Sequence, residues 1–292
     1  MPITHETKET SIEKSPAIYL FTFIMFIAFV LLFSIFPPEG IDWIQCYYKV
    51  AQNPLHPYEI GLFINPPWIA LLLFPFRFIS ENTSLAVNTT LNLMAIGLLV
   101  LTRKGSTLSL VLSLTSFPVL SAIANGNIEW IIALGFILKN EWGVPLLMLK
   151  PQVGILAILS WDSFKRKKMV LFLPACLTIL LSFVIWGNWL SDITRNIDNL
   201  QNIKDGLQSW NSSFFPWSIP MGVFLVYLIV KKNPANSEIL GVFATLCIVP
   251  YFAIYSIGIL YALISARYKR ISILLWILLW LYPFTKHLFR TG

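Results

Sequence analysis

The stretch "AIYLFTFIMFIAFVLLFSIF", residues 17–36, decides the class of fold because it is twenty residues long and carries no charge. As a helix rising 1.5 Å per residue, it matches a hydrocarbon core of about 30 Å. A signal-peptide core has about 7–15 apolar residues behind a cationic leader. Residues 1–16 instead carry three glutamates. We therefore expect residues 1–16 to be a cytoplasmic tail and residues 17–36 to be a retained transmembrane helix.

The rest of the chain has the same apolar character. Of its 292 residues, 57% are hydrophobic and 12% are charged, whereas a soluble domain has about 25% charged residues. Apolar runs continue to residue 289, so we expect one transmembrane domain over residues 17–289. This composition predicts a multi-pass membrane protein. We expect it in the cell (plasma) membrane, with a cytoplasmic N-terminus.

Basic residues indicate how the chain is oriented. The net charge is +7, but the positive residues lie in short clusters between apolar runs, where the positive-inside rule places them, so we expect no nucleic-acid partner. The clusters are Arg103 with Lys104, residues 165–168, Lys231 with Lys232, and residues 267–270. With all of them cytoplasmic, the fold class is an all-α polytopic membrane bundle of about nine to eleven hydrophobic segments. Residues 37–60 and 187–213 then form outer loops. A bundle of straight helices with some charges on the wrong side remains an alternative.

Two segments are expected to be broken rather than straight. Residues 144–161 must leave and re-enter the cytoplasmic side, yet they are too short for two spans. Pro151 interrupts helical hydrogen bonding in their middle, so we expect two half-helices that meet at Lys150. Residues 238–265 are expected to break in the same way at Pro250.

Two further segments complete the expected topology. Residues 106–122 rise to the outer side, where "ANGN" (124–127) follows. Residues 61–80 dip in from the outer side and return to it. If residues 61–80 cross the membrane fully instead, the orientation of the chain from there to residue 139 inverts.

Asp42 is a candidate general base. It lies about six residues past the first helix, between Ile41 and Trp43. Partly apolar surroundings raise the pKa of a carboxyl group, which suits a general base. A helix cap or a solvated loop acid is the alternative interpretation, and Glu39 and Glu59 are competing carboxylates.

Lys150 is a candidate anion-binding residue. An ammonium group inside a transmembrane segment costs a few kcal/mol, so it should face water or an anion. The half-helix that begins at Pro151 and Gln152 adds backbone donors and a positive dipole end. Together these features suit a phosphate at membrane depth. The alternative is a lysine paired with a buried acid.

With these residues in hand, the chain resembles the GT-C polyprenyl-phosphate-dependent glycosyltransferases, and most closely glycosyltransferase family 87, which includes membrane mannosyltransferases. The motifs that carry the resemblance are "DWIQCYY" (42–48), "HPY" (56–58), "NPPW" (65–68), Gly126 with Asn127, Lys150 with Pro151, and "PYFAIYS" (250–256). Their order spans residues 17 to about 265, with no motif specific by itself.

The resemblance implies transfer of a hexose, mannose or another, from a polyprenyl-phosphate sugar to an acceptor hydroxyl at the outer face, with inversion. Asp42 would deprotonate the acceptor, a lipid or a glycan, and Lys150 and Gln152 would bind the donor phosphate. The implied substrate-binding residues are His56, Tyr58, Glu59, Asn65, Asn127, Tyr251 and Tyr255. No metal or other cofactor is expected.

The chain departs from the family pattern at two positions and in length. Asn127 stands where Gln is common and Ser256 where Asp is usual, and 292 residues is short for the family. A catalytically degenerate accessory subunit is therefore the second hypothesis, and a lipid or solute transporter is the third. A water-filled cavity shared by Asp42 and Lys150 would favour the enzyme.

Overall fold

The computed structural model describes residues 16–166, 168–201 and 211–290 of the chain. Regular structure in these residues is helical, apart from an isolated bridge between Asn211 and Ala253. The α-helices in chain order are α1 (Pro16–Ile35), α2 (Tyr48–Gln52), α3 (Ile69–Leu73), α4 (Glu81–Thr102), α5 (Thr107–Leu114), α6 (Phe117–Asn125), α7 (Glu129–Leu138), α8 (Gly143–Leu147), α9 (Pro151–Gly154), α10 (Asp162–Arg166), α11 (Lys168–Trp186), α12 (Trp189–Gln201), α13 (Ile219–Lys232), α14 (Ser237–Ile248), α15 (Ile257–Arg267) and α16 (Lys269–Arg290). The expected tail over residues 1–16 lies outside the described residues, apart from its last residue.

Two described helices, α4 and the Met169–Trp186 part of α11, are long and apolar enough to cross a membrane. Helices α5 and α6 make a third candidate if the bent pair is one span. Shorter apolar helices of 10–17 residues accompany them. The all-helical class predicted from the sequence is confirmed, and the described part contains two or three helices of membrane-spanning length.

Residues 106–122, which we expect to rise to the outer side, form a bent pair of helices rather than one helix. Helix α5 ends at Leu114, and α6 starts at Phe117 with its axis turned by 48°. Pro118, the second residue of α6, has no N–H to donate to the Leu114 carbonyl, so the helical hydrogen bonding of α5 cannot continue through it.

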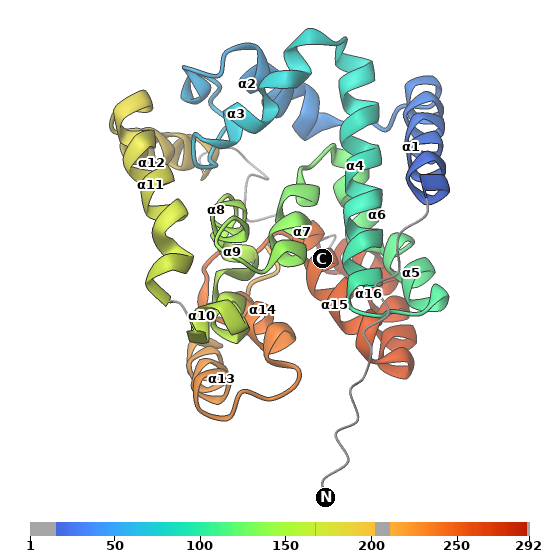
Figure 1. Ribbon diagram of the computed structural model, residues 1–292, viewed down its shortest axis with the longest axis vertical. Coiled ribbons are helices and arrows are strands. Elements are labelled where there is room, and N and C mark those ends of the chain that lie inside the picture. The colour runs from blue at the N-terminus through green and yellow to red at the C-terminus, as the bar shows by residue number, and fades with distance from the viewer. Residues whose placement is uncertain (1–15, 167, 202–210, 291–292) are drawn as a thin grey trace, which may run out of the picture.

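The expected break at Lys150 is confirmed. Helix α8 ends at Leu147, and α9 starts at Pro151 and continues as a 3₁₀ helix over Ile155–Ser160. Lys150 lies between them with φ −137° and ψ 72°, outside the helical region. Proline at the first position of α9 lacks only an N–H that would have had no helical partner. Lys150 is therefore at the tip of a broken hairpin beside α7 (Figure 1).

The second expected break is also present. Helix α14 ends at Ile248, Val249 is extended, and a 3₁₀ turn over Ile254–Ser256 leads into α15. Pro250 cannot continue the helix because it has no N–H to donate. The chain around Tyr251 is therefore irregular, as the sequence predicts.

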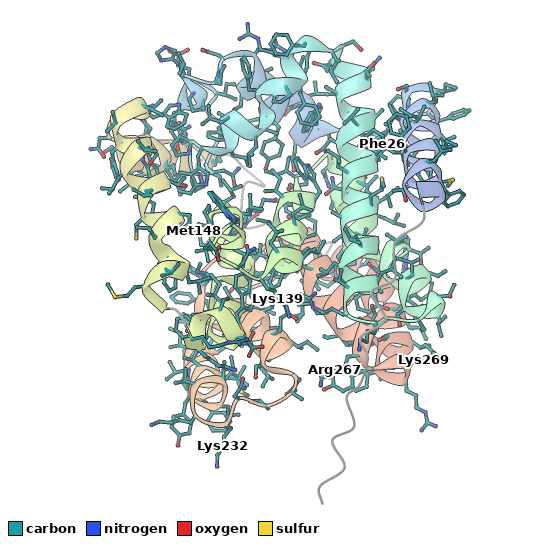
Figure 2. The ribbon with its side chains drawn as sticks, viewed as in Figure 1. Phe26, Lys139, Met148, Lys232, Arg267 and Lys269 are labelled. Atoms are coloured by element: carbon teal, nitrogen blue, oxygen red, sulfur yellow. The ribbon has the colours of Figure 1, made fainter. Side chains whose placement is uncertain are left out.

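The basic residues gather at one end of the molecule. Lys139, Lys232, Arg267 and Lys269 lie in the lower half of Figure 2, at the ends of α7, α13 and α15 and the start of α16. Arg103 joins them, because it shares Glu238 with Lys139. We call this the basic end. Its existence agrees with the charge pattern of the sequence.

The opposite end is formed by residues 40–80, which are more helical than the expected loop. They contain a π-helical turn over Trp43–Tyr47, then α2, and later α3 followed by a 3₁₀ helix to Phe78. Tyr48 Oη donates to the Ile79 carbonyl at 3.1 Å, so the segment folds back on its own start. Its longest helical run, Ile69–Phe78, has 10 residues. Residues 61–80 therefore contain no single helix of membrane-spanning length.

The second expected outer loop, residues 187–213, is also partly helical, and its residues 202–210 lie outside the described residues. Helix α12 occupies Trp189–Gln201. The Asn196 amide of α12 donates to the carbonyls of Tyr58, Ile60 and Phe63. The polar segments after α1 and after α11 thus pack together at the same end of the molecule.

Trp43 anchors the segment after α1. Its side chain is fully buried, donates from Nε1 to Ser84 Oγ of α4 at 2.8 Å, and packs edge-on to Phe76 with ring centroids 4.9 Å apart. Burial of an indole with its N–H satisfied contributes roughly 2–3 kcal/mol. This anchor holds the neighbouring Asp42 in place.

Candidate functional site

Two glycines bring the Asp42 segment against the start of α7. Gly40 and Gly126 have φ values of +64° and +70°, and the Gly40 N–H donates to the Ala124 carbonyl at 2.8 Å. A Cβ on Gly126 would lie 2.6 Å from Trp43 Cβ and 3.1 Å from Gly40 Cα. Only glycine accepts both this conformation and this proximity without strain. Asn127, the next residue, is thereby placed next to Asp42.

Asp42 is half-buried, and Asn127 Nδ2 donates to its Oδ2 at 2.9 Å. Burial raises the pKa of Asp42 above its ordinary value, while the Asn127 hydrogen bond and the charge of Lys150 lower it. Burial is the largest of these causes, as the flanking Ile41 and Trp43 predict. The carboxylate is therefore a stronger base than a solvated aspartate.

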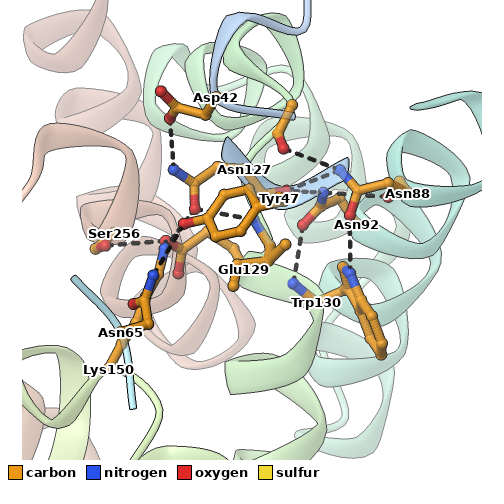
Figure 3. Close-up of polar contacts among 12 residues, drawn as sticks. Asp42, Tyr47, Asn65, Asn88, Asn92, Asn127, Glu129, Trp130, Lys150 and Ser256 are labelled. Atoms are coloured by element: carbon orange, nitrogen blue, oxygen red, sulfur yellow. Dashed lines mark hydrogen bonds and ion pairs between the residues drawn. The ribbon is translucent and has the colours of Figure 1, made fainter. Parts of the chain in front are cut away.

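Asn127 is fixed by two asparagines on α4. Asn88 and Asn92, one helical turn apart, donate to the Asn127 carbonyl at 3.0 and 2.6 Å. The side-chain oxygen of Asn88 accepts from the indole N–H of Trp130 at 2.9 Å, and the side-chain oxygen of Asn92 accepts from the Trp130 backbone N–H at 2.8 Å (Figure 3). The backbone of Asn127 is thus held by a satisfied buried network, and its side-chain Oδ1 accepts from the Ile128 N–H at 2.8 Å, which helps to orient the amide.

Lys150 is paired with Glu129, and both side chains are buried, with 4% and 3% of their surface exposed. The Lys150 ammonium donates to Glu129 Oε1 at 2.7 Å and to Asn127 Oδ1, and it lies 5.1 Å from the centre of the Tyr255 ring. Ser256 Oγ also donates to Glu129 Oε1, at 3.0 Å. Lys150 is therefore paired with a buried acid, Glu129, which was the alternative to anion binding in the sequence analysis. We call Asp42, Asn127, Glu129, Lys150 and Ser256 the Lys150 cluster.

Glu129 is the residue that sequence reasoning missed. It opens the apolar run "IEWIIALGFIL" (128–138), where an ionised group needs a partner. That rule could have matched it to Lys150, although 21 residues separate them. Glu129 Oε2 is buried and has no hydrogen-bond partner among the described residues. The carboxylate therefore retains capacity for one more donor.

Three of the predicted substrate-binding residues lie against the cluster or next to it. Tyr255 stacks on the Lys150 ammonium, and Tyr251 forms a hydrogen bond with Tyr255. Asn65 is buried, and its amide donates to Tyr47 Oη at 3.4 Å beside the cluster (Figure 3). Tyr58 lies one step further away, since its hydroxyl donates to the Asn65 carbonyl at 2.9 Å.

The remaining predicted residues are not brought into the cluster. His56 and Glu59 are 65% and 70% exposed and lie 3.9 Å apart, and Glu59 also accepts from Asn53. Gln152 is half-buried on α9, and its side chain makes no hydrogen bond with the described residues. Their predicted contacts with substrate are not visible in the geometry of the chain itself.

Asp42 and Lys150 are connected through a side chain rather than through open space. The amide of Asn127 touches both, with Nδ2 on Asp42 and Oδ1 on Lys150. Because Lys150 is almost fully buried, it does not face the shared water-filled cavity that would have favoured an enzyme directly.

No group of three or more His, Cys, Asp or Glu side chains in the described residues is arranged to hold a metal ion. Comparison of the chain with protein-family models, with curated proteins and with solved structures found no match. Fold and site define a helical protein with two or three helices able to cross a membrane. It carries a buried lysine–glutamate pair linked by one amide to a half-buried aspartate.

Proposed function

We propose that the protein is a membrane glycosyltransferase that moves a hexose from a polyprenyl phosphate to an acceptor hydroxyl, with Asp42 as general base. The observation that carries the proposal is the convergence of Asp42, Asn127 and Lys150. They lie 85 and 23 residues apart in sequence, yet their side chains form one connected chain of hydrogen bonds. They also occupy the motif positions on which the resemblance to glycosyltransferase family 87 rests.

Asp42 has the chemistry of a general base. Asn127 orients Oδ2, while Oδ1 makes no hydrogen bond with the described residues and is available to an acceptor. The acceptor hydroxyl gives its proton to Asp42 and its oxygen attacks the anomeric carbon. The bond from that carbon to the phosphate oxygen breaks, and the lipid phosphate leaves from the opposite face, which inverts the configuration.

Lys150 would stabilise the charge that develops on the leaving phosphate. In the chain alone, Glu129 and Asn127 accept from its ammonium. On this proposal, a phosphate oxygen replaces Asn127 as acceptor while Glu129 keeps the lysine in position. Ser256 stands where the family usually has Asp, and its hydroxyl bonds to Glu129. Glu129 would therefore supply the carboxylate that position 256 lacks.

In the membrane, the proposal places the basic end in the cytoplasm, as the positive-inside rule requires. The Asp42 end then faces outward in the cell (plasma) membrane. The helices of membrane-spanning length and the broken hairpins together form a polytopic GT-C-like bundle. The broken hairpins bring irregular backbone into the bundle, which membrane proteins tolerate where it lines a cavity, and the donor site would have to open there.

The test is sugar transfer in vitro by purified protein given labelled polyprenyl-phosphate hexoses and a membrane lipid extract. Asp42→Asn keeps an oxygen for Asn127 but removes the base, so transfer falls by about 10²–10⁴-fold. Glu39→Gln is the matched control because Glu39 is an exposed carboxylate three residues away. Equal activity in wild type and Asp42→Asn would remove Asp42 from this role.

A second candidate is an accessory membrane subunit that keeps the scaffold without catalysis. The closed Lys150–Glu129 pair favours it, since a lysine already neutralised by a buried acid needs no substrate to balance its charge. Folded wild-type protein that transfers none of a panel of hexoses would support this candidate over the enzyme.

A further inference from the structure

The basic end contains a cavity of about 350 Å³ that the proposed function does not use. It is lined by the residues that directly follow α4 and α7, by parts of α10 and α15, and by the turn between α13 and α14 with the first turn of α14. Pockets of about 300–1,000 Å³ are the size that small ligands occupy. The charged side chains that line it are Arg103, Lys139, Asp162, Lys165, Glu238 and Arg267. Cations outnumber acids by two.

One of the two acids is already bound to cations. Glu238 accepts from Arg103 Nε and Nη2 at 2.9 and 2.8 Å, and from Lys139 Nζ at 3.0 Å. We call Arg103, Lys139 and Glu238 the basic-end cluster. One carboxylate between two cations leaves this cluster positive. Burial lowers the pKa of Lys139, whereas the charge of Glu238 raises it.

The other two cations have no acidic partner. Lys165 and Arg267 form no ion pair with the described residues, and Arg267 donates only to the Ala235 carbonyl. Asp162, the second acid, lies within 4.0 Å of Arg166 and is largely exposed. The cavity therefore has two unpaired cations on its wall, in addition to the positive basic-end cluster.

The backbone on the cavity wall is held in an uncommon conformation. Lys139 and Asn233 both line the cavity and both have positive φ, +49° and +42°. Non-glycine residues rarely adopt this region unless their surroundings impose it. This left-handed conformation ends α7 at Lys139 and α13 at Asn233. The Lys139 side chain then reaches Glu238.

We propose that this cavity binds a phosphate group, carried either by a phospholipid headgroup or by a small soluble phosphorylated compound. Two arginines and two lysines around one small cavity can hold a multiply charged phosphate by charge-assisted hydrogen bonds. The site lies at the basic end, away from α2 and α3 at the top of Figure 1, and does not depend on the proposed transferase activity.

The test measures the thermal unfolding midpoint of the full chain in neutral detergent micelles. One arm adds inorganic phosphate against chloride at equal ionic strength, and the other adds phosphatidic acid against phosphatidylcholine. In at least one arm, the wild-type midpoint rises by about 2–4 °C when the phosphate probe is in excess. A response to phosphate alone identifies a soluble compound, and a response confined to phosphatidic acid identifies a lipid headgroup.

Variants separate the site from general charge effects. Arg267→Gln and Lys165→Gln weaken the apparent affinity about tenfold each, because each removes a charged donor from the wall. Arg270→Gln and Lys232→Gln, exposed cations of the same end outside the cavity, leave it unchanged. Glu238→Gln tightens binding of the phosphate probe, because it frees Arg103 and Lys139 from their ion pairs. No response in either arm, or equal responses in Arg267→Gln and Arg270→Gln, would overturn the proposal.

Discussion

The Lys150 cluster and the basic-end cluster join the same kinds of groups at the two ends of α7, but they differ in burial. Lys150 and Glu129 are 4% and 3% exposed, whereas Arg103, Lys139 and Glu238 are 18%, 37% and 14% exposed. Water and salt reach the second cluster and not the first. A carboxylate–cation pair is therefore part of the core at one end and part of a surface network at the other.

The largest difference is expected when each carboxylate is neutralised. Glu129→Gln leaves the Lys150 ammonium buried beside a neutral amide, so the free energy of unfolding falls by about 3–5 kcal/mol. Neutralising both partners in Glu129→Gln/Lys150→Met restores most of that loss, since no buried charge then remains. Denaturant unfolding in detergent measures both. If Glu129→Gln alone is as stable as wild type, the Glu129–Lys150 pair is solvated and the prediction is wrong.

The second prediction tests how the Lys150 cluster is assembled. Gly187→Ala adds a Cβ in the left-handed region with nothing within 4 Å, at about 1 kcal/mol. Gly126→Ala adds the same strain and a 2.6 Å clash with Trp43, so it costs about 1–3 kcal/mol more. Unfolding of the two variants side by side measures the difference. Equal costs would mean that Trp43 moves away freely.

At the basic end, Glu238→Gln is expected to cost about 1 kcal/mol, because the pairs it removes are partly exposed. The loss should shrink at high salt, where exposed charges are screened. The loss of stability in Glu129→Gln should not shrink at high salt, because that pair is buried. Unfolding midpoints at low and high salt for both variants measure this contrast, and the same salt dependence in both would contradict the difference in burial.

The smallest effect concerns Asp42 and pH. Burial raises the pKa of Asp42 in the folded chain above its unfolded value, so the folded state binds the proton more tightly. Stability from this group therefore falls as pH rises from the ordinary carboxyl range through the raised pKa. Asp42→Asn should remove that fall and raise the unfolding midpoint slightly at neutral pH. A lower midpoint for Asp42→Asn would reverse the sign.

Local chemistry made part of this structure predictable. Pro151 and Pro250 lack the N–H that a helix needs, so both breaks follow from the residues themselves. The shared basic end follows from the spacing of the Lys and Arg clusters. Ile41 and Trp43 predict the raised pKa of Asp42.

Other features depend on partners distant in the chain. The Glu129–Lys150 pair exists because α7 and the broken hairpin pack together, which no local pattern states. Helix α12 was expected as a loop because its residues are polar. Its polar Asn196 is buried by bonds to backbone carbonyls of residues more than 130 positions earlier. The bend between α5 and α6 was missed because Pro118 was not weighed against the apolar run.

The measurement that tests the account most directly is sugar transfer by Glu129→Gln/Lys150→Met beside wild type, with stability measured on the same samples. The account predicts that wild type transfers hexose from a polyprenyl phosphate. It also predicts that the double variant is nearly as stable but has lost transfer by about 10²-fold or more, since its phosphate-binding cation is gone. A double variant that is stable and fully active would contradict it, and the pair would then be structural alone.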